Sequence, residues 1–178
     1  MTLVLDTTAL LALHVSCAQR QVVADAMRDD QTWCASAMAL AECLAGIDRI
    51  TEEPILREEL EDSIRRTWDY IHVVPVDQRC IDEASLISRA QPVSLGKALH
   101  LAAVQRLPGP LSLVTFDPGQ ITVALGMNVN GTNVNVIRAL QPGGGGLVAS
   151  VGGGSKATKS HDQYRNPQYP VEQSGKGG

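Results

Sequence analysis

The fold is decided by residues 3–11, which read LVLDTTALL. Residues 3–5 form a short aliphatic run, which is typical of a fully buried strand in a parallel sheet. A carboxylate follows at Asp6, and an apolar helical pattern begins directly after it. The hydroxyl of Thr7 or Thr8 can cap that helix by accepting a hydrogen bond from one of its first backbone amides. Taken alone, Asp6 reads as a turn or capping residue, but its place at the end of a central strand is where ligands of α/β sheets collect.

The composition of the chain favours a single globular domain. Its 178 residues are 44% hydrophobic and 19% charged, which is enough to bury a core of ordinary size. The formal net charge of -4 argues against a protein that coats nucleic acid through its overall charge, although it leaves room for a local basic patch. Aromatic residues make up only 3% of the chain, so we do not expect a stacking platform for single-stranded RNA.

The sequence predicts a cytoplasmic protein. It contains no apolar run long enough to cross a membrane, and its N-terminus lacks the charged and apolar segments of a secretion signal. Four cysteines, at positions 17, 34, 43 and 80, are scattered without a C-x-x-C motif or a cysteine–histidine cluster. We therefore expect reduced thiols rather than zinc sites or disulfides.

Strand and helix patterns alternate along the chain. This alternation predicts an α/β fold with a mostly parallel central sheet that is covered by helices on both faces. The segment at residues 94–104 is apolar on nearly every side and is expected to be a buried helix. The other expected strands are residues 32–35, 71–74, 111–116 and 127–129, and the other expected helices are residues 22–27, 37–45, 54–68, 79–90 and a short one ending at residue 125.

The ordered domain is expected to end near residue 140. Beyond it, the chain contains glycine runs at residues 143–146 and 152–154 and lacks a core-forming pattern. We therefore predict one domain over residues 1–140 and a flexible, disordered, Gly-rich tail over residues 141–178.

Three carboxylates are candidates for a functional site. Asp6 and Asp117 each follow an expected strand, and Glu42 lies within the apolar helical segment at residues 37–45. A carboxylate among apolar neighbours is uncommon inside a fold unless it is paired or binds a metal, but by periodicity alone Glu42 could equally face solvent. Three oxygen ligands without Cys or His suit Mg²⁺ or Mn²⁺, which could activate water and stabilise charge on a phosphodiester. Thr115 could position that water or a phosphate, or it could simply fill a strand position.

Four short blocks resemble the signature blocks of PIN-domain proteins. They are LDTTA at residues 5–9, ALAE at residues 39–42, ALHLAA at residues 98–103 and VTFD at residues 114–117. The blocks occur in the family's order over residues 1–130. They are most similar to those of VapC-type toxins, the ribonuclease half of bacterial toxin–antitoxin pairs.

The resemblance implies a fold, an activity and partners. The fold would be a three-layer α/β/α sandwich, and the activity would be that of a metal-dependent endoribonuclease that hydrolyses RNA phosphodiester bonds. Asp6, Glu42 and Asp117 match the family's acidic positions, so the resemblance implies that they are catalytic and bind Mg²⁺ or Mn²⁺. It also implies a cognate antitoxin that covers the site and a homodimer of the toxin.

One position departs from the family pattern. The third block usually has an aspartate immediately before the ALHLAA-like run, and this chain has Lys97 there. The change reverses the local charge, so we expect it to weaken metal binding. Lys97 could pair with Asp6, Glu42 or Asp117 and replace the ion, or it could bind the RNA phosphate while the acids still hold a metal. His100, in the same block, is expected to be a core or supporting histidine rather than a catalytic one.

Other classes of protein fit these residues less well or differ in activity. A haloacid-dehalogenase-type phosphatase needs a second aspartate two residues after the first, where this chain has Thr8. A receiver domain needs an acidic pair ahead of its first helix, which the sequence lacks. The serious rival is a PIN-fold protein without nuclease activity that binds antitoxin or RNA, and Lys97 separates the two hypotheses. Isolated basic residues are further candidates for RNA contact, namely Arg79, Arg89 and Arg106.

Overall fold

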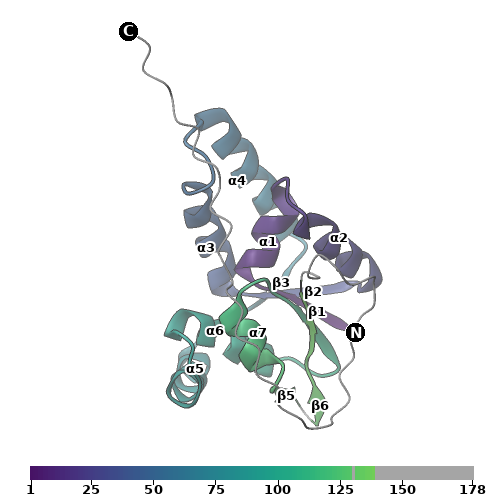
Figure 1. Cartoon of the computed structure of the whole chain (residues 1–178), viewed down its shortest axis with the longest axis vertical. Helices are drawn as coiled ribbons and strands as arrows, with labels where there is room; N and C mark the ends of the chain where they lie inside the picture. The colour runs from purple at the N-terminus through teal and green to yellow at the C-terminus, as the bar shows by residue number, and fades with distance from the viewer. Residues whose placement is uncertain (130, 139–178) are drawn as a thin grey trace, which may run out of the picture. The chain divides into compact units, whose positions relative to one another are not determined.

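Five strands form a parallel sheet in the computed structural model of the chain, which describes residues 1–129 and 131–138 (Figure 1). The strand order is β3-β2-β1-β4-β7, and every neighbouring pair runs parallel. The aliphatic run at residues 3–5 is buried in the central strand, as its composition predicts. The strands are β1 (Thr2–Leu5), β2 (Thr32–Ser36), β3 (His72–Val74), β4 (Leu111–Val114) and β7 (Asn135–Ile137).

Helices cover both faces of the sheet. Side chains alternate between the faces of a strand, and in β1 Leu3 and Leu5 pack with α1 to α4, whereas Val4 packs with α5 to α7. This arrangement confirms the predicted three-layer α/β/α fold with a parallel central sheet (Figure 1). The helices are α1 (Thr7–His14), α2 (Gln19–Asp29), α3 (Ala37–Ile47), α4 (Pro54–Trp68), α5 (Gln78–Ala90), α6 (Leu95–Gln105) and α7 (Pro118–Ala124).

The topology places a crevice at the carboxyl ends of β1 and β4. The strand that follows β1 in sequence, β2, lies on one side of it, and β4 lies on the other, which makes this edge a topological switch point. The register pairs Leu5 with Val114, and the backbone N–H of Asp6 donates to the carbonyl of Val114 across 3.2 Å. The residues that follow these two strands are therefore neighbours, although more than a hundred positions separate them in sequence.

Of the residues that could cap the first helix, Asp6 does so, and neither Thr7 nor Thr8 does. α1 begins at Thr7 and its N-cap is Asp6, whose carboxylate accepts a hydrogen bond from the amide of Ala9. The reason is that an aspartate one position before the helix reaches the third amide, whereas Thr8 is already helical. At the start of α3, Ser36 is the N-cap, but its side chain makes no capping hydrogen bond.

The last strand of the main sheet is also not the expected one. Residues 127–129 were expected to complete it, but β5 (Asn128–Val129) pairs antiparallel with β6 (Thr132–Asn133) in a separate two-stranded sheet. The fifth strand of the main sheet is β7, which pairs with β4. The two segments have nearly the same asparagine–valine pattern, so the local sequence does not distinguish the edge strand from the hairpin strand.

The buried helix was predicted correctly. α6 buries Ala98, Leu101 and Val104 among its apolar residues, together with His100.

The predicted tail at residues 141–178 lies outside the described residues. In the part of the chain that is described, the helices include none with the length and apolar character needed to cross a membrane.

Candidate functional site

Asp6 is the most buried carboxylate of the candidate site. It directly follows β1, and the residue is 1% exposed. One carboxylate oxygen, Oδ1, accepts from the Thr8 hydroxyl at 2.7 Å and the Ala9 amide at 2.8 Å, and the other, Oδ2, accepts from the Thr115 hydroxyl at 2.6 Å. Burial raises the pKa of Asp6, and these hydrogen bonds oppose the rise because they favour the ionised form. The chain therefore supplies donors to both oxygens.

Thr115 joins the ends of β1 and β4. Besides donating to Asp6, its hydroxyl accepts from the backbone amide of Asp117 at 3.1 Å. The Asp117 carboxylate in turn caps α7 by accepting from the Gln120 amide at 3.0 Å through Oδ1. Thr8 adds a second link between the strand ends, since its hydroxyl accepts from the amide of Phe116 at 2.8 Å. Hydroxyl groups thus fix both aspartates relative to the backbone.

Glu42 is hydrogen-bonded rather than simply solvated. It lies on α3 with its side chain 38% exposed, and its Oε2 contacts His100 Nε2 at 2.8 Å and accepts from the Thr7 hydroxyl. The opposite ring nitrogen of His100 lies 3.0 Å from the Ser36 hydroxyl, and the histidine itself is 5% exposed. The hydrogen bond from His100 lowers the pKa of Glu42, with Thr7 adding to the effect. The expectation that His100 is a buried, supporting histidine is confirmed.

Lys97 forms an ion pair with Asp117. Its Nζ lies 2.8 Å from Asp117 Oδ2, with side-chain exposures of 39% for Lys97 and 19% for Asp117. Gly119 adjoins this pair, because a Cβ at that position would lie 3.1 Å from Asp117 Oδ1 and 3.3 Å from Lys97 Nζ. The sequence left several roles open for Lys97. In the structure, it pairs with an acid, and that acid is Asp117.

Cys43 lies next to the carboxylates but is chemically quiet. Burial, together with the negative charges of Asp6 and Glu42, raises the pKa of this thiol to about 12. A thiol that remains protonated at neutral pH is a poor nucleophile and a poor metal ligand. All four cysteines are free, as expected for reduced thiols.

The acids do not form the metal site that the resemblance implies. Within residues 1–129 and 131–138, no three His, Cys, Asp or Glu side chains gather into a group that could hold a metal ion. The donor chemistry agrees with this, because Asp6 accepts three hydrogen bonds from the chain, Glu42 is bonded to His100, and Asp117 already faces the ammonium of Lys97. The side chains present therefore do not fit a divalent ion held jointly by Asp6, Glu42 and Asp117.

The remaining basic candidates differ in their surroundings. Arg106 makes two hydrogen bonds of 2.6 and 2.7 Å to the carboxylate of Asp77, which lower the pKa of that carboxyl, and a third to the carbonyl of Pro75. Within the described part of the chain, neither Arg79 nor Arg89 forms an ion pair with the site acids. We call the carboxyl ends of β1 and β4, with Asp6, Glu42 and Asp117, the acidic edge. Lys97 is thus the basic candidate that lies at this edge.

Sequence reasoning missed three contributors to the site. They are Ser36 and Gly119, which no motif singles out, and Thr7, which was expected only as a possible helix cap. The available signal was position, since Thr7 follows the end of β1 and Ser36 is the last residue of β2, the strand beside it. Hydroxyl groups at the carboxyl ends of adjacent parallel strands meet at one edge of the sheet.

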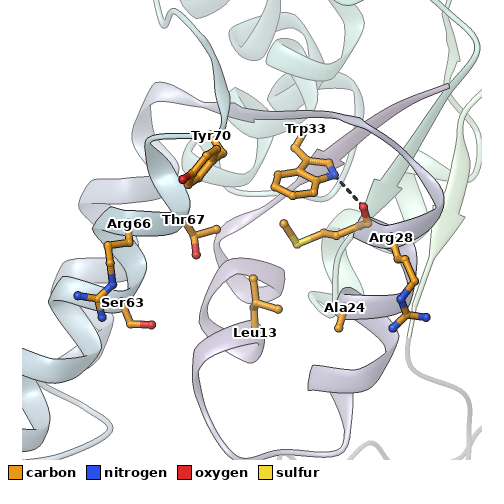
Figure 2. A pocket seen from close by; sticks show the side chains of 9 residues that line it. Leu13, Ala24, Arg28, Trp33, Ser63, Arg66, Thr67 and Tyr70 are labelled. Atoms are coloured by element: carbon orange, nitrogen blue, oxygen red, sulfur yellow. Dashed lines mark hydrogen bonds between the residues drawn. The ribbon is translucent and has the colours of Figure 1, made fainter.

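A separate hollow lies away from the acids (Figure 2). It has a volume of about 490 Å³, and the indole of Trp33 donates to the carbonyl of Met27 at its wall. None of the site residues described above is among those that line it, which are Leu13, Ala24, Met27, Arg28, Trp33, Ser63, Arg66, Thr67 and Tyr70. This hollow is therefore not the place where the carboxylates meet.

The fold and the acidic edge together define a class of α/β protein with carboxylates at a topological switch point. The chain belongs to the PIN-domain family, whose model matches residues 3–125. A comparison with curated proteins found no match.

Several solved structures share the fold. FitAcB from Neisseria gonorrhoeae is 14% identical with a TM-score of 0.57, and 76% of this chain covers 96% of that one. VapBC2 from Rickettsia felis, bound to a DNA fragment from its promoter, is 11% identical with a TM-score of 0.54 and coverages of 76% and 98%. The sarcin-ricin loop cleaving toxin VapC20 of Mycobacterium tuberculosis is 17% identical with a TM-score of 0.54 and coverages of 68% and 94%. Identities this low establish the shared fold alone.

Proposed function

We propose that this chain is a VapC-like toxin, an endoribonuclease that hydrolyses RNA phosphodiester bonds. The observation that carries the proposal is the pairing of Asp6 and Asp117 at the carboxyl edge of β1 and β4, where Thr115 joins them. The match of the chain to the PIN-domain family supports a nuclease in general. The toxin VapC20, which shares the fold, supports the more specific assignment.

The proposed roles follow from exposure and charge. Asp117 and Glu42 are partly exposed and can contact a substrate directly, whereas Asp6 is buried and contributes its negative charge from inside the protein. The ammonium of Lys97 is exposed enough to bind a phosphate oxygen of RNA, and Thr115 keeps the two aspartates in place. Phosphate recognition by a lysine needs only proximity, because its ammonium is a point charge on a flexible stem.

The divalent ion that the resemblance implies does not fit the contacts of the acids. The resemblance implies Mg²⁺ or Mn²⁺ on Asp6, Glu42 and Asp117. These three acids are hydrogen-bonded to the chain or paired with Lys97, and they are not arranged to hold a divalent ion together.

A second candidate function is a PIN-fold protein that binds RNA or antitoxin without cutting RNA. The observation that favours it is the ion pair of Lys97 with Asp117, because this position has a lysine where the family usually has an aspartate. An ammonium at this place offsets the negative charge that would attract a divalent ion.

The proposed partners are an antitoxin and a second copy of the chain. One solved structure with the same fold is named as a toxin–antitoxin complex, from Klebsiella pneumoniae, which supports a protein antitoxin that covers the acidic edge. Dimerisation is proposed from the resemblance. Light scattering on the purified chain, alone and with a candidate antitoxin, measures both associations directly.

The test of function is cleavage of labelled total RNA with and without Mg²⁺ or Mn²⁺. The native chain, Asp6→Asn and Lys97→Asp are compared, and Asp77→Asn serves as the control because Asp77 is a carboxylate paired with Arg106 outside the site. Cleavage by the native chain and by Asp77→Asn, lost in Asp6→Asn, supports the ribonuclease. A native chain that is inert, with metal-dependent cleavage gained in Lys97→Asp, supports the second candidate. A full set of inactive proteins contradicts the ribonuclease proposal.

A further inference from the structure

We propose that Lys97 is the resident cation of the acidic edge and takes the place of a divalent ion there. In the folded native chain, its ammonium would neutralise Asp117, and the stability of the fold would not depend on Mg²⁺ or Mn²⁺. The inference concerns the same carboxylates as the proposed function, but it holds whether or not the chain cuts RNA.

The first argument is the use of the carboxylate oxygens. Asp117 Oδ2 faces Lys97 Nζ at 2.8 Å, and Asp117 Oδ1 accepts from the amide of Gln120. Both oxygens of Asp6 accept hydrogen bonds from the chain. A metal ion would compete with these donors, and beside Asp117 it would meet the like charge of the Lys97 ammonium. Such repulsion is strong in a partly buried site.

The second argument is that one helix supplies basic groups to two of the acids. Lys97 and His100 lie three residues apart on α6, so they share a face of that helix. Lys97 contacts Asp117, which follows β4, and His100 contacts Glu42 on α3. α6 therefore brings a basic side chain into contact with each of these two acids. The chain's own basic side chains therefore occupy positions beside these carboxylates that a bound cation would otherwise take.

The third argument is steric. Gly119 faces the ion pair, and a Cβ there would lie 3.3 Å from Lys97 Nζ and 3.6 Å from Lys97 Cδ. The contact with Nζ is tighter than ordinary packing, so a larger residue at this position would push the end of the lysine aside. The glycine leaves the room that the ammonium and the end of its stem occupy.

The test is thermal unfolding of the full chain with and without Mn²⁺, comparing the native protein with Lys97→Asp and Lys97→Met. The control is Arg106→Met, which removes a cation from a similarly close ion pair with Asp77 outside the site. We expect no metal-dependent change of Tm in the native chain or in the control. A site opened by Lys97→Asp should raise Tm by roughly 5–10 °C when the ion is at about 100 times its Kd. Lys97→Met should show a smaller rise, because it removes the ammonium without adding a ligand.

A second measurement does not depend on the folding of the variants. Mn²⁺ is titrated into the native chain and into Asp6→Asn, and free Mn²⁺ is followed by electron paramagnetic resonance. We expect the two proteins to give the same weak uptake. Tight uptake by the native chain that is lost in Asp6→Asn would overturn the inference, as would a native Tm that rises with Mn²⁺ as much as that of Lys97→Asp. Failure of the proposed function would appear separately, as absence of RNA cleavage in proteins whose metal response is as expected.

Discussion

Thr115 and Asp6 are joined by a hydrogen bond of 2.6 Å in which the hydroxyl donates to the carboxylate, across the two central strands. Both residues are buried, and the same hydroxyl accepts from the amide of Asp117. One threonine therefore fixes the spacing of the two aspartates. Its β-branched side chain was consistent with a plain strand residue, but its hydrogen bonds make it a positioning residue of the acidic edge.

Replacing this hydroxyl with a methyl group should be costly. Thr115→Val keeps the shape of the side chain but leaves Asp6 Oδ2 without its donor, which should reduce the free energy of unfolding by about 1–3 kcal/mol. The pKa of Asp6, already raised by burial, should rise further because the lost bond favoured the ionised form. Thr122→Val is the control, since the Thr122 hydroxyl bonds the Pro118 carbonyl at an exposed position. Urea unfolding at neutral pH measures both, and equal losses would contradict the assignment.

Gly119 and Gly126 offer a matched pair of alanine substitutions. At Gly119 an added Cβ would lie 3.1 Å from Asp117 Oδ1, whereas at Gly126 the nearest atom, the Val123 carbonyl oxygen, would be at an ordinary 3.5 Å. We expect Gly119→Ala to be less stable than Gly126→Ala by about 1 kcal/mol, because crowding near a fixed carboxylate requires neighbours to move. Thermal unfolding of the two variants side by side checks this. If Gly119→Ala is at least as stable as Gly126→Ala, the side chains of Lys97 and Asp117 can move apart without cost, which would contradict the expectation.

Glu42 should stabilise the fold at neutral pH and lose that effect in acid. The hydrogen bond from His100 lowers the pKa of Glu42 in the folded state, so the stabilisation is complete above the ordinary value of 4.5. It is lost as the pH falls through the lower, folded-state pKa. Glu42→Gln should therefore be less stable than the native chain at pH 7, by about 1 kcal/mol given the partial exposure of the side chain. This difference should shrink below pH 4.5, and a difference that is constant with pH would contradict the expectation.

His14 should make stability fall in mild acid. Its ring contacts the Ser63 hydroxyl at 2.9 Å, and burial, aided by the charges of Arg20 and Arg66, lowers the pKa of the imidazole in the folded state. The unfolded chain then takes up a proton near pH 6.5 more readily than the folded one, so stability decreases as pH falls through 6.5 toward the lower pKa. His14→Gln should weaken this decrease, by under about 1 kcal/mol because the ring is partly exposed. Denaturant unfolding at pH 7.5 and 5.5 measures it, and an unchanged slope in the variant would be the contrary result.

The layers of the fold and the order of its principal elements were predictable from local patterns. The aliphatic run at residues 3–5 and the apolar segment at residues 94–104 are buried as expected, because burial on every side leaves a continuous apolar signal. The edge strand β7 was missed for the opposite reason. It is a short, partly buried segment whose pattern resembles the neighbouring hairpin.

Local patterns in the sequence were enough to predict that Asp6 and Asp117 follow buried strands and that Glu42 lies on an apolar helix. They also showed that Lys97 stands where PIN proteins usually have an aspartate. The partners of these groups could be identified only from the folded chain. His100 meets Glu42 from 58 positions away, and Lys97 meets Asp117 rather than the other acids. The physical reason is that periodicity specifies the face on which a side chain lies, whereas its partner depends on how strands and helices from distant parts of the chain are packed together.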